Sequence, residues 1–248
     1  MASGRSLKER VQAGEVLIGA FLPPTVTRER LEQVLKFHPY DFIHVDSQHL
    51  PFSEERIAGL CCEAGELGVP VILRIKHPRN AYLVGAYADL GVSGVEVPQV
   101  ESEETALEAL DYFYYPPQGR RSSGGTWSFG FTPAPGKNHR VEYAEWWNRS
   151  GLLMLQVESL EAITMARRLA KLGVDCLSWG AAPHSADLAF SLENNPWHPF
   201  KSDDDCLRYT IQQLEGTSTR MFVRIDGPQE REKYIGMGAT VLRENPPV

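Results

Sequence analysis

Residues 152–179 read LLMLQVESLEAITMARRLAKLGVDCLSW, in which two short apolar runs flank one amphipathic stretch. The runs Leu152–Val157 and Val174–Trp179 have the length of buried strands, and Ser159–Leu172 carries apolar residues in helical spacing. Gly173 separates this helix from the second strand, at a position where a left-handed backbone conformation closes a helix. The stretch therefore predicts a strand, a crossover helix and a second, parallel strand.

The same unit recurs along the chain. The apolar runs that predict strands are Val16–Phe21, Asp41–Val45, Val69–Ile75, Gly94–Val97, Leu152–Val157, Val174–Trp179, Arg220–Ile225 and Ala239–Leu242. The stretches between them that predict helices are Arg28–Lys36, Glu54–Leu67, Tyr82–Leu90, Ser102–Tyr112, Ser159–Leu172 and Cys206–Leu214. Glycines that join a helix to an apolar strand stand at Gly68, Gly91, Gly173 and Gly238.

Eight strands with crossover helices favour an α/β fold of the closed (β/α)8 type, a TIM barrel, over an open doubly wound sheet. The open sheet is the alternative. No G-x-G-x-x-G motif follows a strand, which argues against a dinucleotide site. The 248 residues suit a single barrel domain, 1–248.

Charge and composition exclude several classes of protein. The net charge of −7 argues against a nucleic-acid binder, which needs a basic face. No apolar run approaches the ~20 residues of a membrane span, and the first ten residues lack the apolar core of a signal peptide. Four cysteines are too few for a disulfide scaffold, so we expect reduced thiols and a cytoplasmic protein.

One segment interrupts the alternation of strands and helices. Residues 114–150 form a long excursion rich in aromatic residues, proline and glycine, including Trp127, Phe131, Trp146 and Trp147. Loops of this length in compact domains are usually functional or lie at an interface. Its aromatic side chains either fill the space beneath an ordered excursion or line a pocket mouth or subunit contact.

Active sites of parallel α/β barrels lie at the carboxyl ends of the strands. The polar residues found at these ends are Asp46, Ser47, Gln48, His49, Arg74, Lys76, His77, Glu96, Gln99, Gln156, Glu158, His184, Arg224, Asp226 and Arg243. Each of them alone could belong to an ordinary salt bridge. Because barrel closure brings all strand ends to one opening, the set as a whole predicts a site.

Three of these residues have distinct chemical uses. His49 can titrate near neutral pH and move a proton, or it is a surface histidine. Arg74 offers a planar fork for a carboxylate or an enolate oxygen, or it forms a structural ion pair. Glu158 is a candidate oxygen ligand for a divalent metal, or it forms a salt bridge at the barrel rim.

The ordered motifs resemble the HpcH/HpaI aldolase family of class II, metal-dependent aldolases, whose fold is a barrel of the phosphoenolpyruvate/pyruvate type. The similarity runs from about Gly14 to Leu242. The motifs that carry it are Ile18-Gly19-Ala20-Phe21, Asp46-Ser47-Gln48-His49, Leu73-Arg74, Ala88-Asp89-Leu90-Gly91, Val97-Pro98, Tyr115-Pro116-Pro117-Gln118-Gly119-x-Arg121 and Gln156-Val157-Glu158.

The resemblance implies a role for each matching residue. His49 corresponds to the catalytic base, oriented by Asp89, and Arg74 to the residue that holds the pyruvyl group and its enolate. Gln156 and Ala182 correspond to substrate contacts. Glu158 corresponds to one of two carboxylate ligands of a divalent ion such as Mg²⁺, Mn²⁺ or Co²⁺.

The chain departs from the family where the second metal ligand is expected. The family has Gly-Pro-Ala-Asp-Leu-Ser after the sixth strand, and here Pro183 falls on the position of the Asp. Three outcomes are open. His184 replaces the carboxylate, which would favour Mn, Fe, Co or Zn over Mg; the loop shifts so that Asp187 reaches the metal; or the site holds no metal or is inactive.

Residues 119–125 offer a further expectation. Their glycines and the guanidinium of Arg121 could form an anion nest that binds the acidic tail of a substrate. The alternative is a turn held by arginine–carboxylate pairs. The family also implies a homo-oligomer.

We therefore expect a carbon–carbon lyase of aldolase type, acting on a small 2-oxo acid through an enolate. One alternative is different chemistry on the same barrel, such as a decarboxylase, a hydratase or a specialised biosynthetic lyase, because fold does not fix reaction. The other alternative is an inactive barrel that serves as a binding module.

Overall fold

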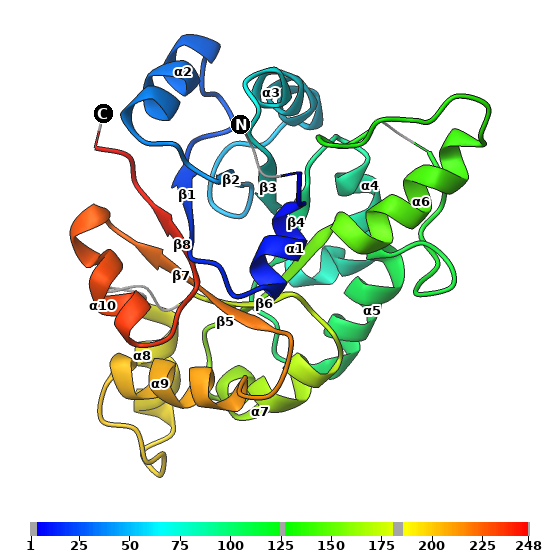
Figure 1. Cartoon of the computed structure of the whole chain (residues 1–248). Helices are drawn as coiled ribbons and strands as arrows, with labels where there is room; N and C mark the ends of the chain where they lie inside the picture. The colour runs from blue at the N-terminus through cyan, green and yellow to red at the C-terminus, as the bar shows by residue number, and fades with distance from the viewer. Residues whose placement is uncertain (1–3, 125–126, 181–185, 248) are drawn as a thin grey trace.

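The computed structural model describes residues 4–124, 127–180 and 186–247 and shows a closed barrel of eight parallel strands in sequence order (Figure 1). The strands are β1 (Leu17–Phe21), β2 (Phe42–Asp46), β3 (Val71–Arg74), β4 (Gly94–Val97), β5 (Leu152–Val157), β6 (Cys176–Trp179), β7 (Arg220–Ile225) and β8 (Val241–Glu244). Every predicted strand is confirmed, and β4, β5 and β7 match at both ends. The open sheet is excluded, because β8 pairs with β1.

Helices follow most of the strands. They are α1 (Leu7–Gln12), α2 (Arg28–Phe37), α3 (Glu54–Glu66), η1 (Pro78–Leu83), α4 (Val84–Ala88), α5 (Glu103–Phe113), α6 (His139–Ser150), α7 (Leu160–Lys171), α8 (Ala186–Asn194), α9 (Asp203–Gln213), η2 (Pro228–Glu230) and α10 (Arg231–Gly236). The six predicted helices are confirmed, although Tyr82–Leu90 is divided between η1 and α4. None of the helices within the described ranges has the length and apolarity to cross a membrane.

The predicted helix-to-strand junctions adopt the left-handed conformation. Gly173, which ends the α7 turn, has φ +92°, and Gly238, before β8, has φ +104°. An L residue with a Cβ atom is strained at such angles. These junctions therefore explain how each helix turns sharply into the next strand.

The lower half of the barrel interior is apolar. Phe42 from β2 and Phe222 from β7 meet at its centre, with ring centroids 6.3 Å apart. Gly19 leaves room for this packing, since a Cβ atom there would collide with the Phe42 ring. Leu7 and Val11 of α1 belong to the same apolar cluster, and α1 lies over this end of the barrel in Figure 1. The amino end of the barrel is thus closed, which leaves the carboxyl end for a site.

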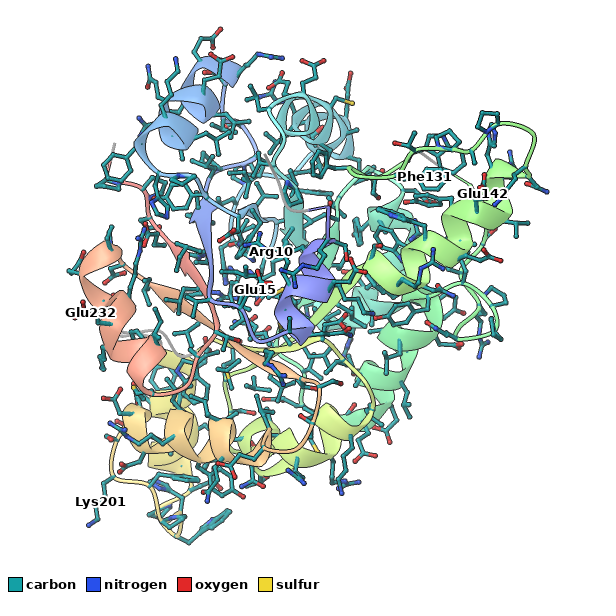
Figure 2. The ribbon with its side chains drawn as sticks, viewed as in Figure 1. Arg10, Glu15, Phe131, Glu142, Lys201 and Glu232 are labelled. Carbon is teal, nitrogen blue, oxygen red and sulfur yellow. The ribbon has the colours of Figure 1, made fainter. Side chains whose placement is uncertain are left out.

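The last third of the excursion 114–150 forms helix α6, which the sequence pattern did not predict. Tyr143 and Trp147 on this helix are almost fully buried, and Phe131 packs against Tyr143 with ring centroids 5.1 Å apart. Figure 2 places Phe131 and Glu142 at the outer edge of the molecule. Tyr143 and Trp147 therefore fill space beneath the excursion, whereas Trp127 is exposed, so the alternative of a pocket mouth or subunit contact stays a prediction.

Candidate active site at the carboxyl ends of the strands

A layer of polar side chains lies above the apolar half of the barrel. Residues paired across parallel strands point to the same face of the sheet. The register pairs that form the layer are Asp46 with Arg74, Arg74 with Glu96, Gln156 with Ser178, and Arg224 with Arg243. The predicted convergence of the strand ends is therefore present for β2 to β8.

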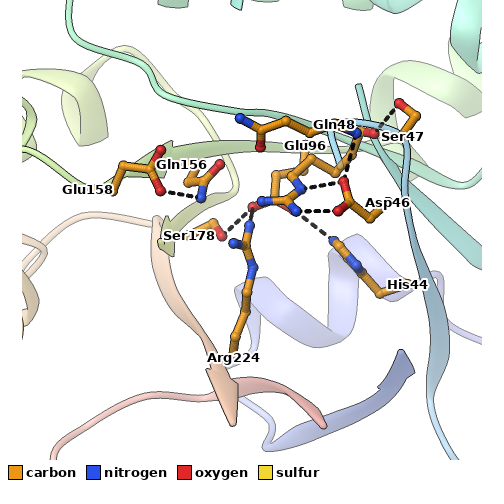
Figure 3. Close-up of polar contacts among 10 residues, drawn as sticks. His44, Asp46, Ser47, Gln48, Glu96, Gln156, Glu158, Ser178 and Arg224 are labelled. Carbon is orange, nitrogen blue, oxygen red and sulfur yellow. Dashed lines mark hydrogen bonds and ion pairs between the residues drawn. The ribbon is translucent and has the colours of Figure 1, made fainter. Parts of the chain in front are cut away.

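Glu96 on β4 is the centre of this layer and is fully buried. One of its carboxylate oxygens accepts hydrogen bonds from Arg224 Nη2 at 2.6 Å and from Ser178 Oγ at 2.5 Å. The other oxygen lies 2.7 Å from His44 Nε2 (Figure 3). Four strands thus contribute to one buried network, which ties the barrel wall together from the inside.

Only some of the titratable groups in this network carry a charge near pH 7. Burial alone would raise the pKa of Glu96, but Arg224 and His44 hold it well below the usual range. Burial lowers the pKa of His44 to about 4, against the opposing effect of Glu96. The imidazole is therefore neutral near pH 7 and donates a hydrogen bond from Nε2, while Glu96 and Arg224 form the ion pair.

Arg74 and Asp46 form a second buried pair. Arg74 Nε donates to Asp46 Oδ1 at 2.7 Å, and Arg74 Nη2 donates to Asp46 Oδ2 at 2.5 Å. Burial opposes the charge, but the bond to Asp46 and the nearby Glu96 and Glu158 carboxyls raise the pKa of Arg74. The two-point pair fixes the plane of the guanidinium, whose third nitrogen, Nη1, has no hydrogen bond to any described residue.

Glu158 follows β5, and its carboxyl group has a raised pKa. Burial, and then the charge of Asp187, raise its pKa to about 7, against the lowering effect of Arg224 and Arg74. Gln156 Nε2 donates to Glu158 Oε2 at 2.7 Å (Figure 3), and Gln156 Oε1 is buried with no hydrogen-bond partner among the described residues. The mouth thus contains a carboxyl group that is poised between its two protonation states, beside an unused acceptor.

Gly180 makes this arrangement possible. A Cβ atom at position 180 would lie 2.5 Å from Gln156 Nε2 and would collide with Glu158 Oε2. We expect Gly180→Ala to displace both side chains and to lower turnover by about 100-fold, since a misplacement of about 1 Å can have that effect. Steady-state kinetics checks this result.

The control for this variant is Gly59→Ala on the exposed side of α3, where an added Cβ atom meets nothing. It should leave turnover unchanged. Equal turnover of Gly180→Ala and the unaltered protein would show that Glu158 and Gln156 do not act in the reaction.

The other two predicted catalytic residues lie on different elements: His49 follows β2, whereas Asp89 is the C-cap of helix α4. His49 is exposed, three residues after β2. Asp89, at the end of α4, accepts a hydrogen bond from Arg121 Nη2 at 2.5 Å. No hydrogen bond between His49 and Asp89 is found among the residues that the structure describes, so the orientation of His49 by Asp89 stays a prediction.

Arg121 is buried in an aromatic environment. Its guanidinium lies 4.5 Å from the ring centroid of Trp147 and 4.8 Å from that of Tyr115, in addition to the bond with Asp89. These contacts match the alternative of a turn held by an arginine–carboxylate pair. The expected role of Arg121 in substrate binding gains no support from them.

The expected second metal ligand is only partly described. Ala182 and His184 lie outside the described residues, as does Pro183. Asp187, in the first turn of α8, is described, and its charge raises the pKa of Glu158. Nowhere in the described ranges do three His, Cys, Asp or Glu side chains gather as a metal cluster. Asp187 is thus near enough to affect Glu158, and the choice among the three alternatives for the second ligand stays a prediction.

His44 and Ser178 were not among the predicted site residues. Both lie within apolar strands rather than after them. The sequence feature that could have identified them is the period of two along a strand. His44 lies on the same face of its strand as Phe42 and Asp46, and Ser178 lies on the same face as Cys176. A polar residue on the inner face of a barrel strand needs a partner, and that requirement could have identified both residues.

Comparisons with known proteins agree with this geometry. A family model described as HpcH/HpaI aldolase/citrate lyase matches residues 26–200. A 2-keto-3-deoxy-L-rhamnonate aldolase of Escherichia coli K12 is 28% identical over 195 residues, which cover 77% of this chain and 69% of that protein. The family match, residues 26–200, spans β2 to β6, where most of the site lies.

Solved structures show the same fold. The crystal structure of an HpcH/HpaI aldolase from Desulfitobacterium hafniense DCB-2 aligns with a TM-score of 0.80 at 22% identity, covering 97% of this chain and 90% of that one. A protein of the HpcH/HpaI aldolase/citrate lyase family from Burkholderia cenocepacia J2315 aligns with a TM-score of 0.77 at 22% identity, covering 96% and 92%.

Proposed function

Because the chain belongs to the HpcH/HpaI aldolase/citrate lyase family, we propose that the polar layer at its strand ends is the active site of a carbon–carbon lyase. The substrate class is a small 2-oxo acid, and the reaction makes or breaks the carbon–carbon bond beside its carbonyl group through an enolate. Arg74, Glu158 and His49 are the residues to which we assign the chemistry.

One observation carries this proposal. Arg74 and Glu158 come from different strands, and each affects the protonation of the other, because the Glu158 carboxyl raises the pKa of Arg74 and Arg74 lowers that of Glu158. A cation and a carboxyl group with a pKa of about 7 therefore share one barrel mouth. An enolate needs such a fixed positive charge at the oxygen where negative charge develops.

The residues present fit a divalent metal ion. Glu158 and Asp187 are two carboxylates that repel each other, and Gln156 adds an unused oxygen acceptor. Oxygen ligands of this kind suit Mg²⁺ or Mn²⁺, which keep water and substrate in their remaining positions. When bound, the metal would supply a Lewis acid for the 2-oxo acid group.

The remaining steps, which are substrate binding, proton transfer and positioning, are assigned to residues of the protein. We assign to Arg74 the carboxylate or enolate oxygen of the substrate, which its Nη1 can reach while Asp46 holds the other two nitrogens. His49, exposed beside β2, moves the proton. Gln156 holds Glu158 in place through its amide nitrogen.

The raised pKa of Glu158 gives a pH dependence. Below about 7 the carboxyl group is protonated in the folded protein, and a metal ion must displace that proton. We expect Mn²⁺ affinity to fall about tenfold for each pH unit below 7 and to change little above it. Titration of the free Mn²⁺ signal by electron paramagnetic resonance between pH 5.5 and 8 measures this directly.

Two variants complete the titration. Glu158→Gln should abolish the pH-dependent binding, and Glu161→Gln, an exposed residue on α7, should retain it. An affinity that is constant from pH 5.5 to 8 would contradict the assignment of Glu158 as a ligand.

Retro-aldol assays test the reaction itself. Candidate 4-hydroxy-2-oxo acids are incubated with the protein, with and without Mn²⁺ or Co²⁺, and pyruvate is detected. Exchange of the methyl protons of pyruvate into D₂O is the simplest partial reaction. Absence of both product and exchange would contradict the proposed function.

We further propose a homo-oligomeric protein of the cytoplasm. All four cysteines are free thiols, which suits a reducing compartment. Phe190 and Trp197, near α8, expose 59% and 74% of their surface, and large exposed apolar side chains are common at subunit contacts. Light scattering after size-exclusion chromatography measures the assembly.

A further inference from the structure

A cavity of about 1080 Å³, called here the amino-end cavity, lies outside the barrel between α1, the second half of α5, the last turn of α6 and the turn after α7. Figure 1 shows α1 and α6 side by side, and their residues are in contact. The last turn of α6 leads into the start of β5, and the turn after α7 leads into the start of β6. The cavity is therefore at the amino ends of the strands, whereas the active site is at their carboxyl ends.

The cavity contains a buried, charged donor. Lys8 of α1 and Tyr114 after α5 both line it and are both buried. Lys8 Nζ donates to Tyr114 Oη at 2.7 Å and lies 3.2 Å from Asp175 Oδ1, and Tyr114 Oη donates to Asp175 Oδ2 at 3.1 Å. An ammonium group has three protons to donate, so these two contacts leave one proton of Lys8 without a partner in the described part of the chain.

Two of the acidic side chains that line the cavity are engaged within the protein. Glu9 accepts hydrogen bonds from Ser6 N at 2.7 Å and from Ser6 Oγ at 2.9 Å, and Asp111 forms an ion pair with Arg120. The guanidinium of Arg149, in the last turn of α6, is exposed and has no ion pair or hydrogen bond within the described ranges. Arg149 is thus a cation of the wall that is open to an anion from outside the chain.

The remaining wall is acidic at one point and otherwise apolar. Glu108 is exposed and also lines a smaller, separate cavity between η1 and α5, so it lies at the rim between the two. Leu107, Leu110 and Leu172 line the amino-end cavity, and Leu107 exposes 51% of its surface. Cavities that combine apolar surface with a few polar groups are typical binding sites for small organic molecules.

We propose that the amino-end cavity is a binding site for a carboxylic acid with an apolar body. Arg149 and Lys8 provide the donors for the carboxylate, and Leu107 and its neighbours contact the apolar body. The site is separate from the active site and does not rest on the proposed function. A bound acid joins α1 to α5 and α6, and it thereby tightens the closure of the amino end of the barrel.

Three small molecules test the two features of this ligand. 3-Phenylpropionate has both the charge and the apolar body, 3-phenylpropionamide lacks the charge, and acetate lacks the body. We expect 3-phenylpropionate to bind at least about 10-fold more tightly than either of the others in ligand-observed NMR titrations, as a charge-assisted hydrogen bond would provide. Hydrogen exchange of the amides of α1, followed by mass spectrometry, should slow when the acid is bound.

Variants locate the site. Arg149→Gln should weaken binding of 3-phenylpropionate at least about 10-fold, and Leu107→Gln should also weaken it. Arg140→Gln and Val141→Gln, at exposed positions of α6 outside the cavity, are the matched controls and should leave the affinity unchanged. Arg74→Lys, at the active site, should also leave it unchanged. Thermal unfolding of each variant shows that it is folded.

The outcomes that would overturn the site are specific. They are equal affinity for the acid and its amide, full affinity in Arg149→Gln, or loss of binding in Arg74→Lys, which would place the acid at the active site. Absence of acid binding together with a changed oligomeric state of Arg149→Gln would assign this face to a subunit contact instead. None of these results decides the proposed function, which the retro-aldol assays test separately.

Discussion

Glu96→Gln is expected to lower the free energy of unfolding by about 3–5 kcal/mol, the usual effect of breaking a buried ion pair. The substitution keeps the shape of the side chain and removes its charge. Arg224 then loses its only carboxylate within the described structure while it stays inside the barrel. Glu96 Oε1 accepts hydrogen bonds from both Arg224 and Ser178, so the loss of its negative charge weakens two hydrogen bonds at once.

Urea unfolding followed by circular dichroism measures this loss. Glu32→Gln is the surface control, since its pair with Arg28 is exposed and should contribute within about 0.5 kcal/mol. The double variant Glu96→Met with Arg224→Met should be more stable than Glu96→Gln, because an apolar pair leaves no charge unpaired. An unchanged unfolding midpoint for Glu96→Gln would show that the network contributes nothing to stability.

The strands of this barrel could be predicted because each is short, apolar and bounded by glycine or polar residues. Val174–Trp179 illustrates the limits of such a prediction. The structure begins β6 at Cys176, and the side chain of Asp175 just before it accepts hydrogen bonds from Leu153 N and Tyr114 Oη. Strand identity follows from local pattern, whereas strand ends depend on neighbours that are distant in the chain.

Helix α6 was not predicted, for a physical reason. Its sequence HRVEYAEWWNRS has few aliphatic residues, and its buried face consists mainly of Tyr143 and Trp147. These rings are buried because Phe113 and Phe131 pack against them from outside the helix. The amphipathic character of α6 is thus created by its tertiary contacts and is weak in the sequence alone.

The sequence could predict which residues lie at the strand ends, but it could not predict which arginine pairs with which carboxylate. That Arg74 and Glu158 share one barrel mouth follows from barrel closure. Which carboxylate pairs with which arginine depends on the register of the strands. Asp46 forms an ion pair with Arg74, and Glu96 forms one with Arg224. The pairing of Asp89 with Arg121 depends on the path of the excursion, which carries no short-range signal.

Arg74→Lys is expected to lower kcat by about 100- to 1,000-fold, comparable to the loss of one oxyanion-hole donor. Lysine keeps the positive charge but is a point donor on a flexible chain. It cannot hold both oxygens of Asp46 and at the same time present a third, fixed nitrogen to the substrate. Because charge is retained, Asp46 keeps a cation nearby and the barrel should stay folded.

The two kinetic constants separate the possible roles of Arg74. If its third nitrogen contacts the substrate equally before and during the reaction, Arg74→Lys raises KM and leaves kcat unchanged. If it stabilises the enolate, kcat and kcat/KM fall together, which is the result we expect. Arg79→Lys, exposed on η1 five residues further along, is the matched control and should change neither constant. A value of kcat within threefold of the unaltered protein would limit Arg74 to its structural pair with Asp46, and the enolate would then need a different cation at the mouth.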